Sequence, residues 1–270
     1  ERITDAAIVG DIPLVKDQTS VGIVVRENRN GLMEETFRNL RTNLQYMLEE
    51  GQKVILFTST TSNEGKSFNA ANLAASFAFM GKKTVVVGLD IRNPRLTKLF
   101  NISNKDGGIT EYLAAPSSTD LLKLCQQTEV SPNLFVLPCG TIPPNPTELV
   151  ARPILDQAIN QLKERYDLVI LDTAPIAMVT DTAIISRVAD MCVYVCRADY
   201  TPKAAFHFIN ELQQKKSFKK LAVVLNGIDM TKRKNSYGYG YGQKYGYGKK
   251  YGYGYADNNR SVSDGDRKKR

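Results

Sequence analysis

Three short polar segments, each next to an apolar run, carry the residue types best suited to chemistry on a phosphate. The first run, VILFT at 54–58, leads through a polar loop to Gly65, Lys66 and Ser67, after which a helical pattern begins. In such a loop, backbone N–H groups and the start of the helix surround phosphate oxygens, the lysine reaches the terminal phosphates, and the serine hydroxyl binds Mg²⁺. The residues predicted to bind the nucleotide here are Thr61, Ser62, Asn63, Glu64, Gly65, Lys66, Ser67 and Phe68.

The other two segments supply carboxylates. Asp90 and Arg92 follow the run TVVVGL at 84–89, and Asp172 closes the run DLVILD at 167–172. A carboxylate at a strand end beside a phosphate loop is what Mg²⁺ coordination requires, directly or through water. The sequence therefore predicts a site for ATP and Mg²⁺, with Lys66, Asp90, Arg92 and Asp172 as catalytic residues and Ser67, Asp90 and Asp172 as metal ligands.

Several of these assignments have simpler alternatives. Thr60 stands where the strict phosphate-loop pattern has its first glycine, so GKS by itself also fits an ordinary strand–turn–helix. Arg92 would either stabilise the phosphates or pair with Asp90. Asn226, which ends the run LAVVLN at 221–226, would either bind the adenine edge through its amide or form a turn before the following glycine.

The elements that must position these residues alternate between strand and helix. Continuous apolar runs, expected of parallel strands buried on both faces, lie at 53–58, 83–89, 134–137, 167–172, 191–197 and 221–226. Helical periodicity lies at 31–50, 66–80, 153–164, 180–189 and 203–216. This alternation predicts an α/β fold, a mostly parallel sheet with helices on both faces, in which ligands bind at the carboxyl ends of the strands. Residues 1–30 look irregular and are assigned to a linker ahead of a domain at 31–230.

Residues 231–270 differ from the rest of the chain in composition. They contain eleven Lys and Arg against three Asp and Glu, which accounts for the whole formal net charge of +8, so the rest of the chain is neutral. The segment 237–256 alternates tyrosine with glycine and lysine, a composition that cannot form a core and predicts disorder. Its positive charge either serves solvation or attracts a polyanion. The tyrosines are Tyr237, Tyr239, Tyr241, Tyr245, Tyr247, Tyr251, Tyr253 and Tyr255.

Cysteine usage and hydropathy argue against several protein classes. The four cysteines form no CxxC pair, and the one histidine, His207, cannot complete a zinc site with them, so we expect buried reduced thiols. No apolar run reaches the roughly 18–20 residues of a membrane span, and there is no signal peptide. The sequence begins at Glu1 instead of Met, which is compatible with a fragment of a longer protein.

The order of these motifs resembles that of the bacterial tyrosine kinases, which are P-loop kinases related to the MinD- and ParA-type ATPases. The resemblance spans about residues 20–256. It includes the helix motif E-x-x-R-x-x-R ahead of the phosphate loop, here Glu35, Arg38 and Arg41, and a C-terminal tyrosine cluster at 237–255. By residue physics alone, Glu35 and Arg38 would be an ordinary i,i+3 surface ion pair.

This resemblance implies an ATP-dependent protein-tyrosine kinase that phosphorylates the tyrosine cluster of a neighbouring subunit in trans. The subunits would form a ring, expected to be an octamer, through Glu35, Arg38 and Arg41. The kinase would lie at the cytoplasmic face of the inner membrane, as part or partner of a membrane polysaccharide co-polymerase, and a phosphotyrosine phosphatase would reverse its reaction. It would thereby control capsule or exopolysaccharide polymerisation and export. No nucleic-acid partner is expected, and the segment AAIVGDIPLV at 6–15 resembles the junction between membrane and kinase parts in fused members.

The sequence departs from the family pattern at three positions. Gly88 replaces the first aspartate of the usual D-x-D-x-R motif, which removes a carboxylate near the metal. Ser62 stands where the loop often has proline, and Ala174 stands where the Asp172 string often has one. Two rival functions are a MinD/ParA-like ATPase switch whose basic tail binds DNA or membrane, and a degenerate nucleotide-binding module that self-associates through its tail.

Overall fold

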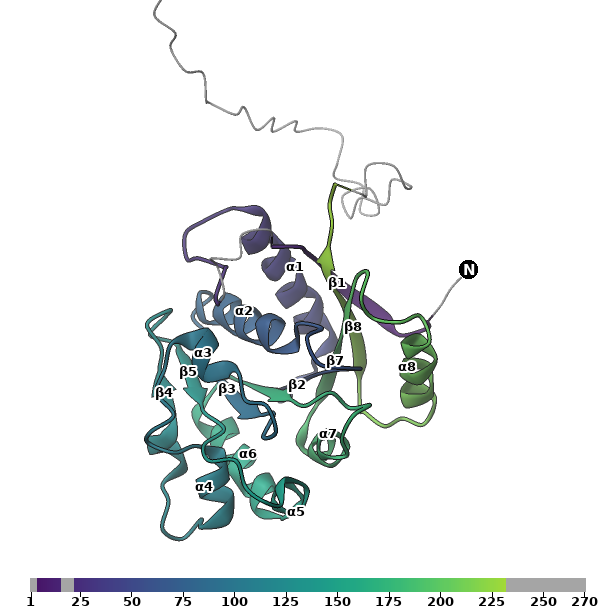
Figure 1. Cartoon of the computed structure of the whole chain (residues 1–270). Coiled ribbons are helices and arrows are strands. Elements are labelled where there is room, and N and C mark those ends of the chain that lie inside the picture. Colours follow the sequence, from purple (N-terminus) through teal and green to yellow (C-terminus); the bar gives the residue numbers. More distant parts are fainter. Residues whose placement is uncertain (1–3, 16–21, 232–270) are drawn as a thin grey trace, which may run out of the picture. The chain divides into compact units, whose positions relative to one another are not determined.

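The fold is built around a single sheet. The computed structural model describes residues 4–15 and 22–231. Within them, eight strands form one sheet in the order β1-β8-β7-β2-β6-β3-β5-β4 (Figure 1). All neighbouring strands are parallel except β4 and β5, which are antiparallel. The predicted α/β class with a mostly parallel sheet is confirmed, whereas the tyrosine cluster at 237–255 lies outside the described residues.

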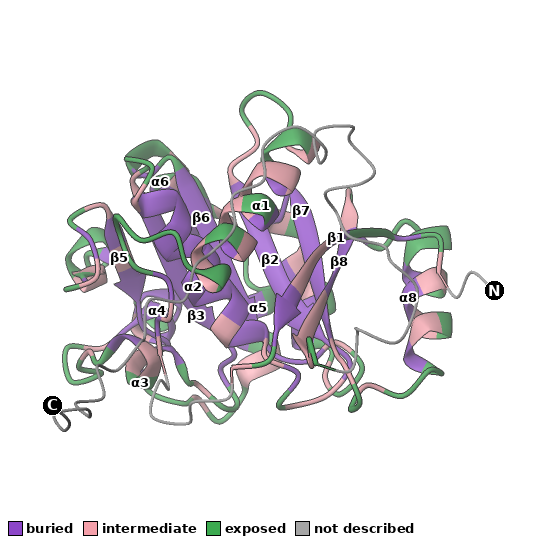
Figure 2. Cartoon of the chain, turned by 90° about the horizontal axis from the view of Figure 1, so that it is seen from above, coloured by how far each residue is buried: buried purple, intermediate pink, exposed green. Residues whose placement is uncertain are grey.

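The central strands are buried on both faces. Their bounds are β1 Ala7–Pro13, β2 Val54–Ser59, β3 Thr84–Leu89, β4 Gln126–Gln127, β5 Leu134–Leu137, β6 Leu168–Thr173, β7 Met191–Arg197 and β8 Leu221–Ile228. Strands β2, β3 and β6 are buried at every residue, as Figure 2 shows. Burial on both faces explains why their sequences are continuous apolar runs instead of alternating ones.

The helices cover the two faces of the sheet. They are α1 Leu32–Met47, α2 Lys66–Ala78, α3 Leu96–Phe100, α4 Ile109–Ala114, α5 Pro146–Ala151, α6 Ile154–Arg165, α7 Asp181–Ile185 and α8 Ala205–Gln214. One core joins α1, α2 and α3 to alternate strand residues such as Ile55, and the other joins α4 to α8 to the intervening residues such as Leu56. The period of two along each strand thus divides its side chains between two apolar layers.

Strand β2 lies where the direction of the chain across the sheet reverses. The connection through α2 leads from β2 to β3 on one side, and β7 pairs with β2 on the other side. In open parallel sheets, loops separate at such a point and leave a crevice at the carboxyl ends of the strands. The loop that follows β2 is therefore in the position where a ligand is expected.

The segment 1–30 contains a strand that the sequence did not predict. Ala7–Pro13 form β1, which is parallel to β8, with Ile8 opposite Val223. The amide of Asn43 on α1 donates to the Val9 carbonyl at 2.8 Å and ties the strand to the first helix. Sequence periodicity missed it because it is an edge strand interrupted by Gly10, Asp11 and Pro13, of the kind that tolerates such residues. The sheet therefore begins well before residue 31.

The cysteines behave as expected from the sequence. All four are free, with Cys139, Cys192 and Cys196 buried and Cys125 half-buried. Burial raises the pKa of the Cys139 and Cys196 thiols to about 12, so both are protonated and inert at neutral pH. Among the described residues, none of the helices is both long and apolar enough to cross a bilayer.

Candidate active site

The loop between β2 and α2 is shaped by two residues with left-handed backbone conformation. Asn63 has a φ of 67° and Gly65 a φ of 95°, and α2 begins directly after Gly65. A Cβ at position 65 would lie 2.1 Å from Nδ2 of Asn226, so a side chain there would displace this amide from the Glu64 carbonyl and would also strain the left-handed backbone. The first N–H groups of α2 have no acceptor within the helix and remain available to an anion.

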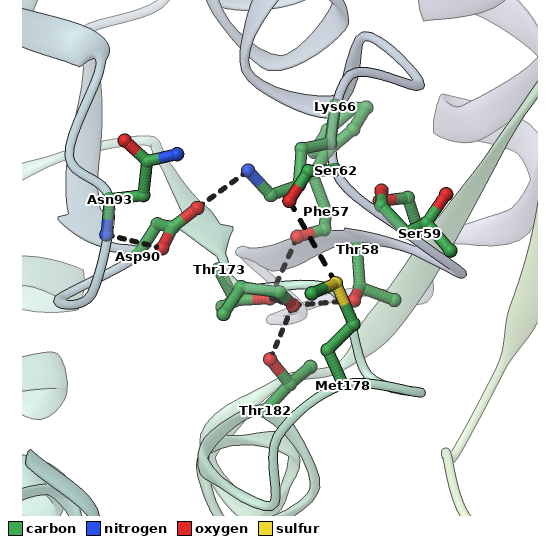
Figure 3. A network of polar contacts seen from close by, with 12 residues as sticks. Phe57, Thr58, Ser59, Ser62, Lys66, Asp90, Asn93, Thr173, Met178 and Thr182 are labelled. Atoms are coloured by element: carbon green, nitrogen blue, oxygen red, sulfur yellow. Dashed lines mark hydrogen bonds and ion pairs between the residues drawn. The ribbon is translucent and has the colours of Figure 1, made fainter.

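Lys66, Asp90 and Asp172 come together at the carboxyl ends of neighbouring strands. Because β2, β6 and β3 are consecutive in the sheet, the segments that follow them share one edge. The Lys66 ammonium donates to Asp90 Oδ2 at 2.7 Å in an ion pair that is almost fully buried (Figure 3). The Asn93 N–H donates to the other oxygen of Asp90 at 3.1 Å. Three of the four predicted catalytic residues therefore occupy one site.

The charges of this site influence one another. Burial alone would lower the pKa of the Lys66 ammonium, but the carboxylates of Asp172 and Asp90 outweigh it and the pKa is raised. Burial raises the pKa of Asp172 to about 6, although Lys66 and a hydrogen bond with Ser67 act in the opposite direction. Lys66 thus stays charged at neutral pH, and additional positive charge nearby would stabilise Asp172 as a carboxylate.

The residues present fit a magnesium ion that shares its ligands with a nucleotide. Asp172 is only 1% exposed, and its Oδ1 has no hydrogen-bond partner in the described structure. Buried carboxylate oxygens are normally bonded, so this one is free for a cation. Within the described ranges, no cluster of three or more His, Cys, Asp and Glu could hold a metal alone. This agrees with Mg²⁺, which commonly takes one or two protein ligands and completes its shell with phosphate and water.

A cavity of about 600 Å³ opens beside the loop. One wall is the loop itself, including Ser62, Asn63 and the residues from Gly65 to Phe68, and the opposite wall runs from Asn93 to Leu99. Its charged lining comprises Lys66, Arg95, Lys98, Arg197 and Asp90. Four cations against one carboxylate suit a polyphosphate.

The strand ends around the site are held in register by threonine hydroxyls. Thr173 donates to the Phe57 carbonyl at 2.8 Å, which ties the end of β6 to β2 (Figure 3). The hydroxyls of Thr58 and Thr182 both donate to the Ala174 carbonyl, at 2.9 and 2.6 Å. Ala174 stands where the family often has proline. Here the two hydrogen bonds to its carbonyl hold its backbone in place, as the ring of a proline would.

The loop is supported by Asn226, near the end of β8, and by its own Glu64 side chain. The Asn226 amide donates to the Glu64 carbonyl at 2.9 Å, and the buried Glu64 carboxylate accepts from the Thr61 N–H at 2.7 Å. Three of the predicted nucleotide-binding residues, Thr61, Glu64 and Asn226, therefore bond to one another and do not line the cavity. Asn226 donates to the loop backbone, which is neither of the two roles considered from the sequence.

The turn that follows β7 makes further loop contacts that the sequence analysis missed. Arg197 donates to the Asn63 carbonyl at 3.0 Å, and the Tyr200 hydroxyl donates to the Ser62 carbonyl at 3.1 Å. The Thr201 hydroxyl bonds to the Glu64 carboxylate. We refer to residues 197–201 as the β7 turn. The only signal in the sequence was a group of polar residues directly after an apolar strand.

Arg92 is bonded away from the phosphate loop. Its Nε donates to Asp181 Oδ2 at 2.8 Å and its Nη2 to the Thr147 hydroxyl at 3.0 Å, and Thr147 in turn donates to Asp181 at 2.6 Å. Neither alternative considered from the sequence, phosphate binding or pairing with Asp90, describes this contact. Asp181 is 1% exposed, so its carboxylate requires these donors. Sequence reasoning overlooked Asp181, although an acid in the first turn of a helix was a visible signal.

Gly88 lies next to Asp172 in the sheet. The two residues are register partners between β3 and β6. A Cβ at position 88 would lie 3.0 Å from the backbone nitrogen of Cys139, so a larger residue requires the segment after β5 to move. The position of the missing family aspartate is therefore packed closely against the backbone of Pro138 and Cys139.

The three residues of the α1 motif have different environments. Glu35 and Arg38 form an exposed ion pair. Arg41 instead donates to the Ser76 carbonyl on α2 at 2.7 Å, and burial lowers the pKa of its guanidinium. A second cavity of about 530 Å³ lies against Arg38 and Arg41. The Glu35 and Arg38 side chains thus face solvent in the single chain, whereas Arg41 is bonded to α2 of the same chain.

Comparisons with known proteins agree with the geometry. A family model described as an AAA domain matches residues 52–223. The chain is 33% identical to the putative tyrosine-protein kinase CapB of Staphylococcus aureus over 229 residues, which cover 84% of this chain and 98% of CapB. Its fold matches the kinase domain of the Escherichia coli tyrosine kinase ETK with a TM-score of 0.73 and 26% identity, over 87% of this chain and 95% of that domain.

A more distant likeness shows the fold alone. The septum site-determining protein MinD of Pyrococcus horikoshii, solved with Mg-ADP, matches with a TM-score of 0.52 and 20% identity, over 64% of this chain and 68% of that one. The sheet is therefore of the MinD/ParA type, as predicted, while the likeness in sequence is to tyrosine kinases.

Proposed function

The chain belongs to the bacterial tyrosine kinases and is an ATP-dependent protein-tyrosine kinase, and we propose that it phosphorylates its own C-terminal tyrosine cluster in trans. The observation that supports this most directly is the buried cluster of Lys66, Asp90 and Asp172, in which Lys66 and Asp90 line a cationic cavity. The tyrosines at 237–255 are the acceptors in this proposal. Because the chain belongs to the tyrosine kinases, we prefer this function to the two rivals, a MinD/ParA-like ATPase switch and a degenerate nucleotide-binding module.

The ion pair between Lys66 and Asp90 suggests how the transfer is prepared. A terminal phosphate in the cavity competes for the Lys66 ammonium, which then leaves Asp90. The released Asp90 carboxylate is free to orient an acceptor hydroxyl and accept its proton. Such help matters because a phenol with a pKa near 10 is almost fully protonated at neutral pH.

Ser67 and Asp172 would hold Mg²⁺ in this proposal, and the ion would neutralise charge that develops on the phosphates. Asp172 contributes a buried, unbonded oxygen, and Ser67, the second residue of α2, hydrogen-bonds to the same carboxyl group. Asp90, also predicted as a ligand, is engaged by Lys66 and Asn93. It would reach the ion only after Lys66 has moved.

The tail composition suits a tethered substrate. Alternating glycines reduce steric demand at the active site, and tethering raises the effective acceptor concentration to about the millimolar range. Each phosphate adds about −1.5 to −2 charges, so about five or more modifications reverse the formal +8 of the tail. We propose that this reversal weakens the contact between subunits and provides the switch.

The wider setting follows the family. We propose a ring of subunits, expected to be an octamer, that uses Glu35, Arg38 and Arg41, at the cytoplasmic face of a membrane. Its partners would be a polysaccharide co-polymerase portion or activator and a phosphotyrosine phosphatase, and its cycle would control capsule or exopolysaccharide polymerisation and export. The exposed Glu35–Arg38 pair and the adjacent cavity supply a surface for such a contact.

Incubation of the purified chain with Mg-ATP, followed by phosphotyrosine detection and peptide mapping, tests the function. We expect phosphate on the tail tyrosines of the wild type and none in Lys66→Met. Mixing tagged Lys66→Met with untagged wild type should label the tail of the tagged chain, which demonstrates transfer in trans. Tyrosine phosphorylation that persists in Lys66→Met alone, or an unlabelled tail in active wild type, contradicts the proposal.

A further inference from the structure

Two tyrosines of the folded part of the chain are accessible to a kinase. Of the five among the described residues, Tyr112, Tyr166 and Tyr194 are buried, whereas Tyr46 and Tyr200 are 87% and 48% exposed. Tyr46 lies in the last turn of α1 and does not line the cationic cavity. Tyr200 belongs to the β7 turn, and its hydroxyl is bonded to the phosphate loop.

We propose that Tyr200 is a second phosphorylation site and that phosphate on it weakens nucleotide binding. The inference rests on the proposed kinase function, because the enzyme itself would supply the phosphate. The Tyr200 oxygen attacks the γ-phosphorus of ATP held by a second copy of the chain, and the bond from that phosphorus to the bridging oxygen of ADP breaks. The phenolic proton passes to a carboxylate or to water, and ADP leaves.

The contacts of Tyr200 give the modification a direct effect on the loop. Its hydroxyl donates to the Ser62 carbonyl at 3.1 Å, and Ser62 lines the nucleotide cavity. A phosphorylated tyrosine has no hydroxyl hydrogen to donate, so this bond is lost. The phosphate also adds close to two negative charges next to Ser62, which lines the cavity where the nucleotide phosphates are expected to bind.

Arg197 extends the effect to a second loop contact. Its guanidinium lies 5.3 Å from the centre of the Tyr200 ring and donates to the Asn63 carbonyl at 3.0 Å. A phosphate on Tyr200 offers this guanidinium a stronger, charge-assisted partner and draws it away from Asn63. Two carboxylates are also close: Asp199 precedes Tyr200 in the chain, and Glu64 contacts Thr201 of the β7 turn. A carboxylate only accepts hydrogen bonds, so neither would bind the phosphate on Tyr200. Two anchors of the loop would thus be released together.

The first measurement locates the phosphate. A chain with all eight tail tyrosines changed to phenylalanine is incubated with Mg-ATP and a trace of tagged wild type, separated, and mapped by mass spectrometry. We expect phosphate on Tyr200 and little on Tyr46, which is the more exposed of the two. Equal modification of both sites, or none at Tyr200 while the wild-type tail is labelled, overturns the inference and leaves the proposed function intact. An unlabelled wild-type tail contradicts the proposed function instead.

The second measurement tests the consequence. The affinity for a fluorescent ADP analogue is compared between the phosphorylated tail variant and the same protein after phosphatase treatment. Loss of one or two loop hydrogen bonds corresponds to roughly a three- to tenfold weaker affinity. Tyr46→Phe in the same background should show the same phosphatase response, and Tyr200→Phe should show none. Unchanged affinity after stoichiometric modification of Tyr200 overturns the regulatory part of the inference.

Discussion

The phosphate loop and the α1 helix carry the two most specific motifs of the chain, and their charged residues lie in different environments. Lys66 and Asp90 form a buried ion pair, whereas Glu35 and Arg38 form an exposed one. Around the loop, Lys66, Asp90 and Asp172 contact or influence one another within the subunit. On α1, Glu35 and Arg38 form an exposed ion pair, and Arg38 also donates to the carbonyl of Arg29, which is nearby in the sequence. The loop residues thus already contact one another within one chain, and we propose that Glu35 and Arg38 of the α1 motif act only when a second chain is present.

Asp172→Asn should have the largest effect and acts only on the loop. Removal of the buried carboxylate should lower the rate of tail phosphorylation by about 100-fold or more, because in the proposed mechanism Mg²⁺ loses a ligand. The measurement is the initial rate at saturating Mg-ATP. Oligomer size by light scattering should remain that of the wild type, and a change in size would mean that the loop and α1 are not separable.

The same variant has a predictable pH dependence of stability. Burial raises the pKa of Asp172 from 3.8 to about 6, so the folded state favours the protonated acid, and its ionisation costs stability as pH rises from about 4 to 6. Relative to wild type, Asp172→Asn should therefore gain up to about 3 kcal/mol in free energy of unfolding across this window in the absence of nucleotide and metal. Denaturant titrations at pH 4 and 7 measure the change, and a wild type that gains relative stability with pH would contradict it.

Gly65→Ala should weaken nucleotide binding by about tenfold or more while leaving α1 untouched. The new Cβ would meet Asn226 at 2.1 Å, and the left-handed backbone adds strain. Gly81→Ala is a matched control, because its φ of 85° imposes similar strain but no atom lies within 4 Å. Fluorescent ADP binding should separate the two variants. Equal losses in both would mean that backbone strain, and not the loop contact, is responsible.

Double substitution of Arg38 and Arg41 by alanine should act on assembly and leave the chemistry of the loop intact. We expect monomers by light scattering and a rate of tail phosphorylation that falls with dilution, because the acceptor is no longer tethered nearby. Lys215→Ala, which removes an exposed i,i+4 pair on α8, is the control and should leave the assembly unchanged. An intact ring in the double variant would refute the assignment of α1.

Arg92→Ala should have the smallest effect on rate and a measurable effect on stability. It leaves the buried Asp181 carboxylate with fewer donors, which costs about 1–3 kcal/mol. If Arg92 only positions the segment around Asp181, combining Arg92→Ala with Asp181→Ala should recover part of that loss. A large fall in rate without loss of stability would instead give Arg92 a direct role on the phosphates.

The pattern of residues predicted most of the fold and the centre of the site. All six predicted strands are present within two residues of their expected bounds, because strands buried on both faces must be written as apolar runs. The edge strands β1 and β4 and the short helices α3, α4 and α5 were missed, since neither burial nor length gave them a periodic signal. The apolar pattern of a sequence therefore predicts a helix or strand more reliably when more of its surface is buried in the core.

The sequence by itself determined which residues we propose for the chemistry. Gly65, Lys66, Ser67, Asp90 and Asp172 stand next to apolar strands, and parallel strands end at one edge. Only the tertiary structure decided how those residues are paired and supported. Lys66 bonds Asp90, Arg92 bonds Asp181, and Asn226 and Tyr200 bond the loop backbone. These partners are separated by 24 to 162 positions in the chain, and their contacts depend on strand order in the sheet, which no local pattern encodes.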